Sequence, residues 1–203
     1  ILTEPLSAAC EILEQVPLGG KERVVVLGDG RLGILCAWVL STALPDVTLV
    51  GHHRDKLELA RWQNVRTAMD ATEVEPGADI VVEATGSGRG IAEAMSLCRP
   101  RGTIVLKSTV AVQGEMHLAP IVVHEQTVLG SRCGRISDGL RIMKAYPDMP
   151  LEKLISARYP LEQAEEAFAR ARNRQALKVL LDVNTGRIRK EAKEGMEGVH
   201  VEA

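Results

Sequence analysis

Three glycines with a fixed spacing are the residues of this sequence best suited to chemistry. Residues 24–33 read Val-Val-Val-Leu-Gly-Asp-Gly-Arg-Leu-Gly, so an apolar run leads directly into Gly28, Gly30 and Gly33. Residues 34–44 follow with helical character. A strand, a Gly-x-Gly-x-x-Gly turn and a helix in this order are typical of a turn that binds a dinucleotide.

Each glycine has a separate role in such a turn. Gly28 allows the tight turn, Gly30 lets the backbone approach a pyrophosphate, and Gly33 brings the helix close to the strand. Arg31 and Leu32 complete the predicted pyrophosphate site, where the helix N-terminus offers N–H groups and the positive end of its dipole. The alternative is a glycine-rich turn that binds no ligand.

The second apolar run ends in Gly51-His52-His53-Arg54. In NAD-binding turns an acidic residue near this point accepts hydrogen bonds from the ribose 2′-OH. Gly51 stands at that position, and without a carboxylate there a 2′-phosphate is not repelled. Arg54, whose fork matches phosphate oxygens, and His52 or His53 can supply positive partners. The sequence therefore favours NADP(H) over NAD(H); the alternative is a solvated loop that still accepts NAD.

Short loops after the later strands provide further candidates. Thr85 and Gly86 follow the fourth predicted strand, across the crevice where the strand order reverses, and so lie beside the expected dinucleotide path. Lys107 and Ser108 follow the fifth strand and Arg132 follows the sixth, at the same carboxyl edge. An ordinary turn is the alternative at Thr85 and Gly86, and a structural ion pair is the alternative for Arg132.

Strand-like and helix-like segments alternate after residue 22. Short apolar, β-branched runs separated by helices indicate parallel strands that are buried on both faces. The sequence thus predicts an α/β fold, a Rossmann-type doubly wound parallel sheet in the order 3-2-1-4-5-6. The predicted strands are 23–27, 47–50, 65–69, 79–84, 103–106 and 128–129, and the helices between them include 34–44, 55–62 and 91–98.

Two regions flank this sheet. Residues 1–16 have the pattern of a helix, and 154–183 read strand, helix, strand, a short flanking α/β segment at the C-terminus. We expect the helix 161–172 to bury Leu161, Ala164, Phe168 and Ala171, and we expect the charged tail to be frayed or loosely docked. The predicted division is 1–16, 17–150, 151–183 and 184–203.

Composition narrows the function classes. The chain has 203 residues, 45% hydrophobic and 2% aromatic, so aliphatic side chains must fill its core. A net charge of −2 gives no reason to expect nucleic-acid or anionic-membrane binding. No apolar stretch approaches the roughly 18–20 residues of a bilayer span. The four cysteines are far apart and form no Cys-x-x-Cys, which favours reduced thiols and a cytoplasmic protein.

Several stretches of the chain are informative when taken together: Glu-Pro-Leu at 4–6, the glycine-rich turn, Asp-Ile-Val-Val-Glu-Ala-Thr-Gly, Arg-Pro-Arg-Gly-Thr-Ile-Val-Leu and Tyr-Pro-Leu-Glu-Gln-Ala-Glu-Glu-Ala-Phe. They resemble the medium-chain dehydrogenase/reductase family, the zinc-containing alcohol dehydrogenase-like proteins. The resemblance implies NAD(P)-dependent oxidation of an alcohol, or reduction of the carbonyl, by a zinc enzyme. It covers the cofactor-binding portion: 1–16 would be the interdomain helix, and 151–183 would return to a catalytic domain that this sequence lacks.

The resemblance also suggests roles for single residues. In polyol and threonine dehydrogenase-like branches, a Glu in a Glu-Pro-Leu context stands in or near the catalytic zinc shell, and Glu4 matches it. One ligand is not a site, so zinc is expected in the parent protein and not in this chain; Glu4 also suits the start of a helix. The loops that hold Lys107, Ser108 and Arg132 would lie near the nicotinamide.

Two other functions remain open at this point. One is a zinc-independent quinone or enone reductase, and the other is a non-catalytic dinucleotide-binding module. For the favoured function the partners are a nicotinamide cofactor and a small alcohol or carbonyl substrate. A homo-oligomer is also expected, because by resemblance the sixth strand presents an uncovered edge that can pair with another chain.

Overall fold

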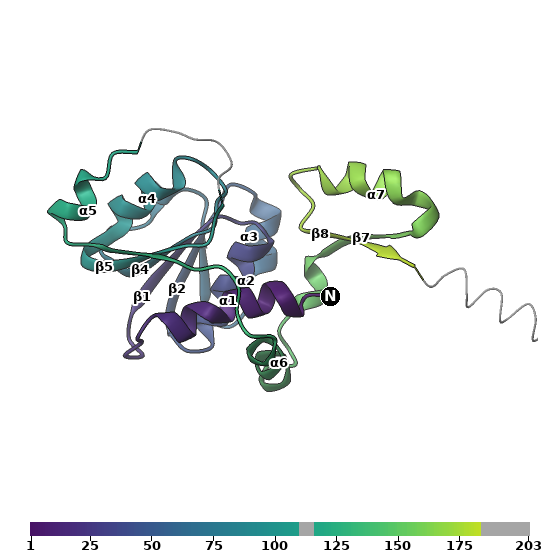
Figure 1. Ribbon diagram of the computed structural model, residues 1–203, viewed down its shortest axis with the longest axis horizontal. Helices are drawn as coiled ribbons and strands as arrows, with labels where there is room; N and C mark the ends of the chain where they lie inside the picture. The colour runs from purple at the N-terminus through teal and green to yellow at the C-terminus, as the bar shows by residue number, and fades with distance from the viewer. Residues whose placement is uncertain (110–115, 184–203) are drawn as a thin grey trace, which may run out of the picture. The chain divides into compact units, whose positions relative to one another are not determined.

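Six parallel strands form one sheet in the first part of the chain (Figure 1). Their order, β3-β2-β1-β4-β5-β6, confirms the predicted doubly wound sheet. The computed structural model describes residues 1–109 and 116–183. The strands are β1 (Arg23–Leu27), β2 (Asp46–Val50), β3 (Val65–Ala68), β4 (Ala78–Glu83), β5 (Cys98–Leu106) and β6 (Thr127–Gly130).

The chain divides into two compact units, Ile1–Pro150 and Leu151–Ala203. The first unit contains the six-stranded sheet with its helices. The second unit contains a separate two-stranded sheet. The helices of the first unit are α1 (Thr3–Gln15), α2 (Arg31–Ser41), α3 (Arg54–Ala60), α4 (Gly90–Leu97), α5 (Ala119–Val123) and α6 (Ile136–Ala145), with a 3-10 turn at Ala71–Glu73.

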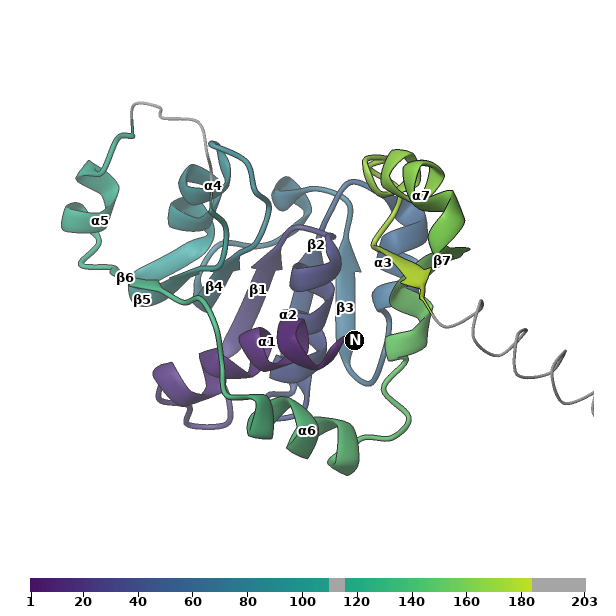
Figure 2. The same cartoon turned by 45° about the vertical axis from the view of Figure 1, so that its right-hand side comes forward.

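The core of the first unit lies on both faces of the sheet. Val25 and Leu27 of β1 belong to one buried cluster with Ile91 and Met95 of α4, so α4 covers that face. Side chains alternate along a strand, which directs Val24 to the opposite face. There α2, which is buried from residue 33 to residue 41, packs against β1 and β2 (Figure 2). Continuous apolar strands and an apolar helix are what a sheet buried on both sides requires.

Helix α2 occupies Arg31–Ser41 rather than the predicted 34–44. It begins earlier because Gly30 is its N-cap, with an extended backbone. It ends earlier because hydroxyl groups take over carbonyls of the last turn: Ser41 Oγ donates to the Trp38 carbonyl (2.8 Å), and Thr42 Oγ1 donates to the Val39 carbonyl (2.6 Å).

Helix α6 was not predicted. It lies beside α1 (Figures 1 and 2), and the two helices approach closely at Gly139, where a Cβ would lie 2.4 Å from Ser7 Oγ. The buried Asp138 accepts from Arg135 (3.2 Å) and lies 2.9 Å from the Arg141 guanidinium. Ile136, Leu140 and Met143 recur at helical spacing, so the sequence did contain a signal for this helix. A helix this short depends on packing for its stability, and α1 is its partner.

The second unit has the predicted strand, helix and strand. Strands β7 (Ile155–Pro160) and β8 (Lys178–Asp182) pair in parallel, and α7 (Ala164–Ala171) connects them after 3-10 turns at Leu151–Leu154 and Leu161–Gln163. The predicted buried face of this helix is wrong. Phe168 is 63% exposed and Leu161 and Ala171 are exposed, while Ala164 is partly buried and Ala167 is buried instead. Two strands offer a narrow surface, which a stripe of alanines covers. The predicted tail, 184–203, lies outside the described residues.

The four cysteines carry free thiols, and Cys10, Cys36 and Cys98 are buried. Burial raises the pKa of Cys36 to about 12. Within residues 1–109 and 116–183, none of the helices combines the length and the apolar character that crossing a bilayer requires.

Candidate functional site

The glycine-rich turn between β1 and α2 has two positions without room for a side chain. A Cβ on Gly33 would lie 1.8 Å from the Gly28 carbonyl oxygen, and a Cβ on Gly28 would lie 2.6 Å from the Ala84 carbonyl oxygen. Gly28 also has a φ of +109°, a conformation that favours glycine. The turn therefore keeps strand and helix in close contact, as predicted from the spacing.

Gly30 is different, because a Cβ there would meet nothing within 4 Å. It lies at the start of α2, where the Ile34 N–H donates to its carbonyl (3.0 Å). The N–H groups of the first turn, including those of Leu32 and Gly33, have no acceptor within the helix. Open space in front of a helix N-terminus fits a pyrophosphate, because N–H groups and the helix dipole both favour an anion.

The loops after β4 and β5 meet at the same edge of the sheet. The buried carboxylate of Glu83 accepts from Thr85 N (2.8 Å) and Thr85 Oγ1 (2.5 Å). The Gly86 N–H donates to Ser108 Oγ (2.7 Å), which joins the two loops. The structure thus brings the predicted residues Thr85, Gly86 and Ser108 together. Glu83 orients this loop, and its place at the end of an apolar strand is the sequence signal for that role.

The surroundings of Lys107 differ from the prediction, which places its loop near the nicotinamide. Its side chain is buried, and its Nζ donates to the Ala8 carbonyl (2.6 Å), Ser131 Oγ (2.9 Å) and the Arg132 carbonyl (3.2 Å). Burial lowers the pKa of this ammonium. An ammonium has three donors, and all three are used. Lys107 therefore ties α1 to the ends of β5 and β6, and its ammonium has no donor left for a cofactor. The side chain of Arg132 is exposed.

The sequence predicts that the end of β2 has no carboxylate, because Gly51 stands there, and the structure corrects this prediction. A carboxylate is present there, and it comes from Asp29, the middle residue of the first Gly-x-Gly. A Cβ on Gly51 would lie 2.3 Å from Asp29 Cβ and 2.6 Å from its Oδ2. The sequence contained a signal for this, because the turn after β1 and the end of the neighbouring β2 lie side by side in the predicted strand order.

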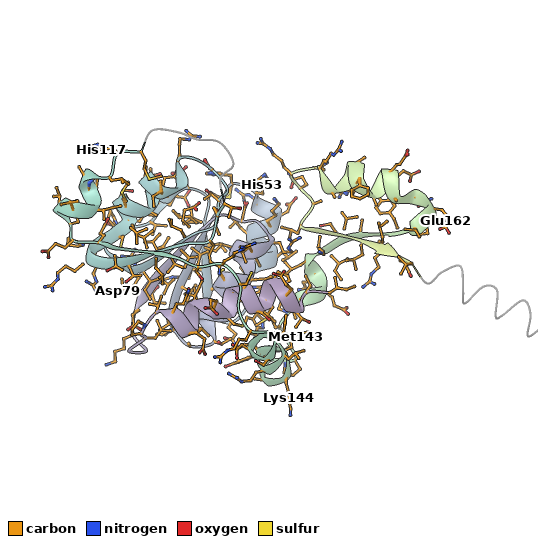
Figure 3. All side chains as sticks on the ribbon, viewed as in Figure 1. His53, Asp79, His117, Met143, Lys144 and Glu162 are labelled. Atoms are coloured by element: carbon orange, nitrogen blue, oxygen red, sulfur yellow. The ribbon has the colours of Figure 1, made fainter. Side chains whose placement is uncertain are left out.

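His53 faces this carboxylate. Its backbone N–H donates to Asp29 Oδ2 (2.7 Å), and its ring Nδ1 lies 2.9 Å from the same oxygen. His52 is exposed, with Nδ1 3.2 Å from the Met69 carbonyl oxygen, and Arg54 is exposed at the start of α3. Figure 3 shows His53 at one end of the sheet and Asp79, near the beginning of β4, at the other. His53 is therefore at the carboxyl edge, with the glycine-rich turn.

Glu4 is exposed in the first turn of α1, where a negative charge suits the helix dipole. Among the described residues no three His, Cys, Asp or Glu side chains are grouped so that they could hold a metal ion. Glu4 as a residue near zinc therefore stays a prediction.

A family model described as "Glucose dehydrogenase C-terminus" matches residues 1–183. The chain belongs to this family. The match confirms the resemblance to zinc-type alcohol and polyol dehydrogenases, and it covers both structural units up to the end of the described residues.

Two curated relatives of this chain are polyol enzymes by name. The D-xylulose reductase A of Aspergillus oryzae is 26% identical over 196 residues, which cover 88% of this chain and 55% of that protein. The sorbitol dehydrogenase of Halalkalibacterium halodurans is 24% identical over 196 residues, covering 89% and 57%. The chain therefore spans little more than half the length of these relatives.

Among solved structures, a dehydrogenase of Sinorhizobium meliloti 1021 bound to NADP has the same fold. It superposes with a TM-score of 0.78 at 22% identity, and the match covers 90% of this chain and 58% of that one. At this identity the likeness concerns the fold, and it agrees with the Rossmann-type sheet described above.

Proposed function

We propose that this chain is the nicotinamide-dinucleotide-binding part of an oxidoreductase that interconverts an alcohol, such as a polyol, and the matching carbonyl compound. The observation that carries the proposal is the open space at Gly30, in front of α2, beside two glycines that are packed against backbone. The names of the two polyol-enzyme relatives support the substrate class. The nicotinamide supplies the hydride chemistry, and the chain binds and orients it.

We propose that the pyrophosphate lies against Gly28, Gly30 and the first turn of α2, formed by Arg31, Leu32 and Gly33. The adenosine ribose then lies toward Gly51 and His53, at the end of β2. The nicotinamide half follows the edge formed by Thr85, Gly86 and Ser108. In the same enzyme a zinc ion bound outside this chain would polarise the alcohol oxygen, with Glu4 near it.

NADP(H) is the cofactor we favour. Arg54 and the neighbouring histidines are cationic or can become so at the place where a 2′-phosphate would lie. The carboxylate of Asp29 would by itself oppose a phosphate, but it is paired with His53 at 2.9 Å, which offsets its charge when the imidazole is protonated.

A calorimetric titration with NADPH and with NADH tests the proposal. In Gly30→Ala the new methyl group fits the folded chain but takes the volume proposed for a phosphate. We expect both cofactors to bind about fivefold to 150-fold more weakly, because filling an occupied volume costs about 1–3 kcal/mol. Gly130→Ala is the matched control: its Cβ also meets nothing within 4 Å, and β6 is three strands from β1 in the sheet order.

Three outcomes of this titration would each contradict a different part of the proposal. Undiminished binding by Gly30→Ala would show that the pyrophosphate lies elsewhere. If the folded wild-type chain binds neither cofactor, the dinucleotide function itself is wrong. Tighter binding of NADH than of NADPH would overturn the cofactor preference and leave the site intact.

We also propose a homo-oligomer that pairs through β6. This strand is at the edge of the sheet, and Val128 on it and Val122 and Val123 on α5 are exposed. Light scattering coupled to size exclusion would give a dimer mass if the pairing occurs in this chain, and a monomer mass would contradict it. The free thiols are consistent with a reducing compartment such as the cytoplasm.

A further inference from the structure

Asp29 and His53 form a closely packed pair that is joined by hydrogen bonds. The Asp29 side chain is almost fully enclosed, although it lies on a turn, and it fills the volume that a side chain at position 51 would need. Gly51 is thus the residue that admits this carboxylate. Oδ2 then accepts two hydrogen bonds from one residue, the backbone N–H and the ring of His53 (2.7 and 2.9 Å).

These contacts define the state of the imidazole. A carboxylate accepts hydrogen bonds and has no proton to donate, so Nδ1 of His53 must carry the hydrogen. The His53 backbone N–H also donates to Asp29, so the start of the His53 side chain is held in place and the ring has one orientation. Nε2, on the other side of the ring, points away from Asp29. The His53 side chain is 29% exposed and the Asp29 side chain 11%, so the histidine is the member of the pair that a ligand would meet.

The charges favour an anionic ligand in front of the pair. When Nε2 is also protonated, the ring carries one positive charge, donates through Nδ1 to Asp29 and offers Nε2–H outward. Asp29 balances the ring on one side, and a phosphate oxygen can do so on the other. The exposed Arg54 follows directly in the chain and adds a second cationic group on the same loop.

We propose that Asp29 is a positioning residue that holds His53 as the ligand of the 2′-phosphate of NADP(H). This inference rests on the proposed dinucleotide site. The carboxylate that sits beside Gly51 then acts through the histidine and does not itself accept the ribose 2′-OH. The opposite assignment, in which Asp29 accepts the 2′-OH and repels the phosphate, predicts effects of opposite sign.

The experiment is a set of NADPH and NADH titrations of the full chain and three variants, Asp29→Asn, His53→Gln and the double variant. For Asp29→Asn we expect NADPH to bind roughly tenfold more weakly or worse, the scale of a lost charged hydrogen bond, and NADH to change less than about twofold. His53→Gln should show the same selective loss. The double variant should lose no more than the worse single variant, because both substitutions break one unit.

Asp46→Asn is the matched control, since it removes the same charge at the opposite end of β2, where Asp46 pairs with Arg66. A loss shared equally by both cofactors in Asp29→Asn would overturn the proposal, because it would mean that Asp29 merely supports the turn. Tighter NADPH binding with weaker NADH binding would also overturn it, in favour of direct contact with the 2′-OH. If the wild-type chain binds neither cofactor, the dinucleotide function fails before this question arises.

Discussion

At the scale of single residues, Asp29 and Gly51 form a compensating pair, because the two positions share one volume. In Gly51→Ala the added methyl group would lie 2.3 Å from Asp29 Cβ. We expect this substitution to lower the free energy of unfolding by about 1–3 kcal/mol, the usual cost of overpacking. Urea denaturation followed by circular dichroism measures it.

Asp29→Gly combined with Gly51→Ala tests the cause of that loss. Removing the Asp29 side chain clears the volume, so the double variant should be more stable than the sum of the two single changes predicts. Additive losses would mean that the strain at Gly51 arises from somewhere other than Asp29.

At the scale of elements, one buried ammonium connects three of them. Lys107 on the β5 end bonds the Ala8 carbonyl of α1 and two groups that follow β6. Lys107→Met keeps much of the volume but takes the ammonium donor away from the Ser131 hydroxyl and the Arg132 carbonyl, while the Ala8 carbonyl keeps the hydrogen bond of its own helix. We expect the free energy of unfolding to fall by about 1–3 kcal/mol, the cost of buried acceptors left unpaired. Lys144→Met, at an exposed position of α6, should change stability far less in the same urea experiment, and equal losses would contradict the bridging role.

An element can be predicted from its own sequence when its composition reflects its burial, and less well when its position depends on the surface it packs against. The strands β1, β2 and β4 are apolar because they are buried on both faces, so their composition alone indicates their place. Helix α6 has apolar residues at helical spacing, which is a local signal for a helix, but its buried positions are Asp138 and Gly139, where it meets α1. For α7 the sequence suggested that Phe168 is buried, yet the two-stranded sheet needs only Ala164 and Ala167 beneath the helix. Such outcomes depend on the partner surface and not on the segment.

At the scale of the whole molecule, the same distinction applies to the candidate site. The positions of Gly28, Gly30 and Gly33 could be predicted, because backbone geometry ties each one to a fixed place in a strand, turn and helix. The position of the Asp29 carboxylate could not be predicted from spacing alone. It depends on the distance between β1 and β2 and on the absence of a side chain at Gly51. The ammonium of Lys107 is similar, because it is the docking of α1 that encloses it.

The packing of the first unit also determines the reactivity of its thiols. Cys10, Cys36 and Cys98 are enclosed by different elements, and Cys133 is exposed. Burial raises the pKa of Cys10 and of Cys98 to about 11 and that of Cys36 to about 12, from the ordinary value of 9.0. Alkylation proceeds through the thiolate, so in the native protein near neutral pH we expect Cys133 to react and the three buried thiols to be protected.

Mass spectrometry after iodoacetamide treatment would then find one label on the native chain and four on the urea-unfolded chain. Rapid labelling of Cys36 in the native state would show instead that the first unit opens readily between α2 and its neighbours.

The same pKa values predict a loss of stability in alkali. Because the folded-state pKa values are raised, the stabilisation is complete below pH 9.0 and is lost as the pH rises toward 11 and 12, where the unfolded thiols have already released their protons. Cys36→Ala should reduce this alkaline slope, whereas Cys133→Ala should leave it unchanged.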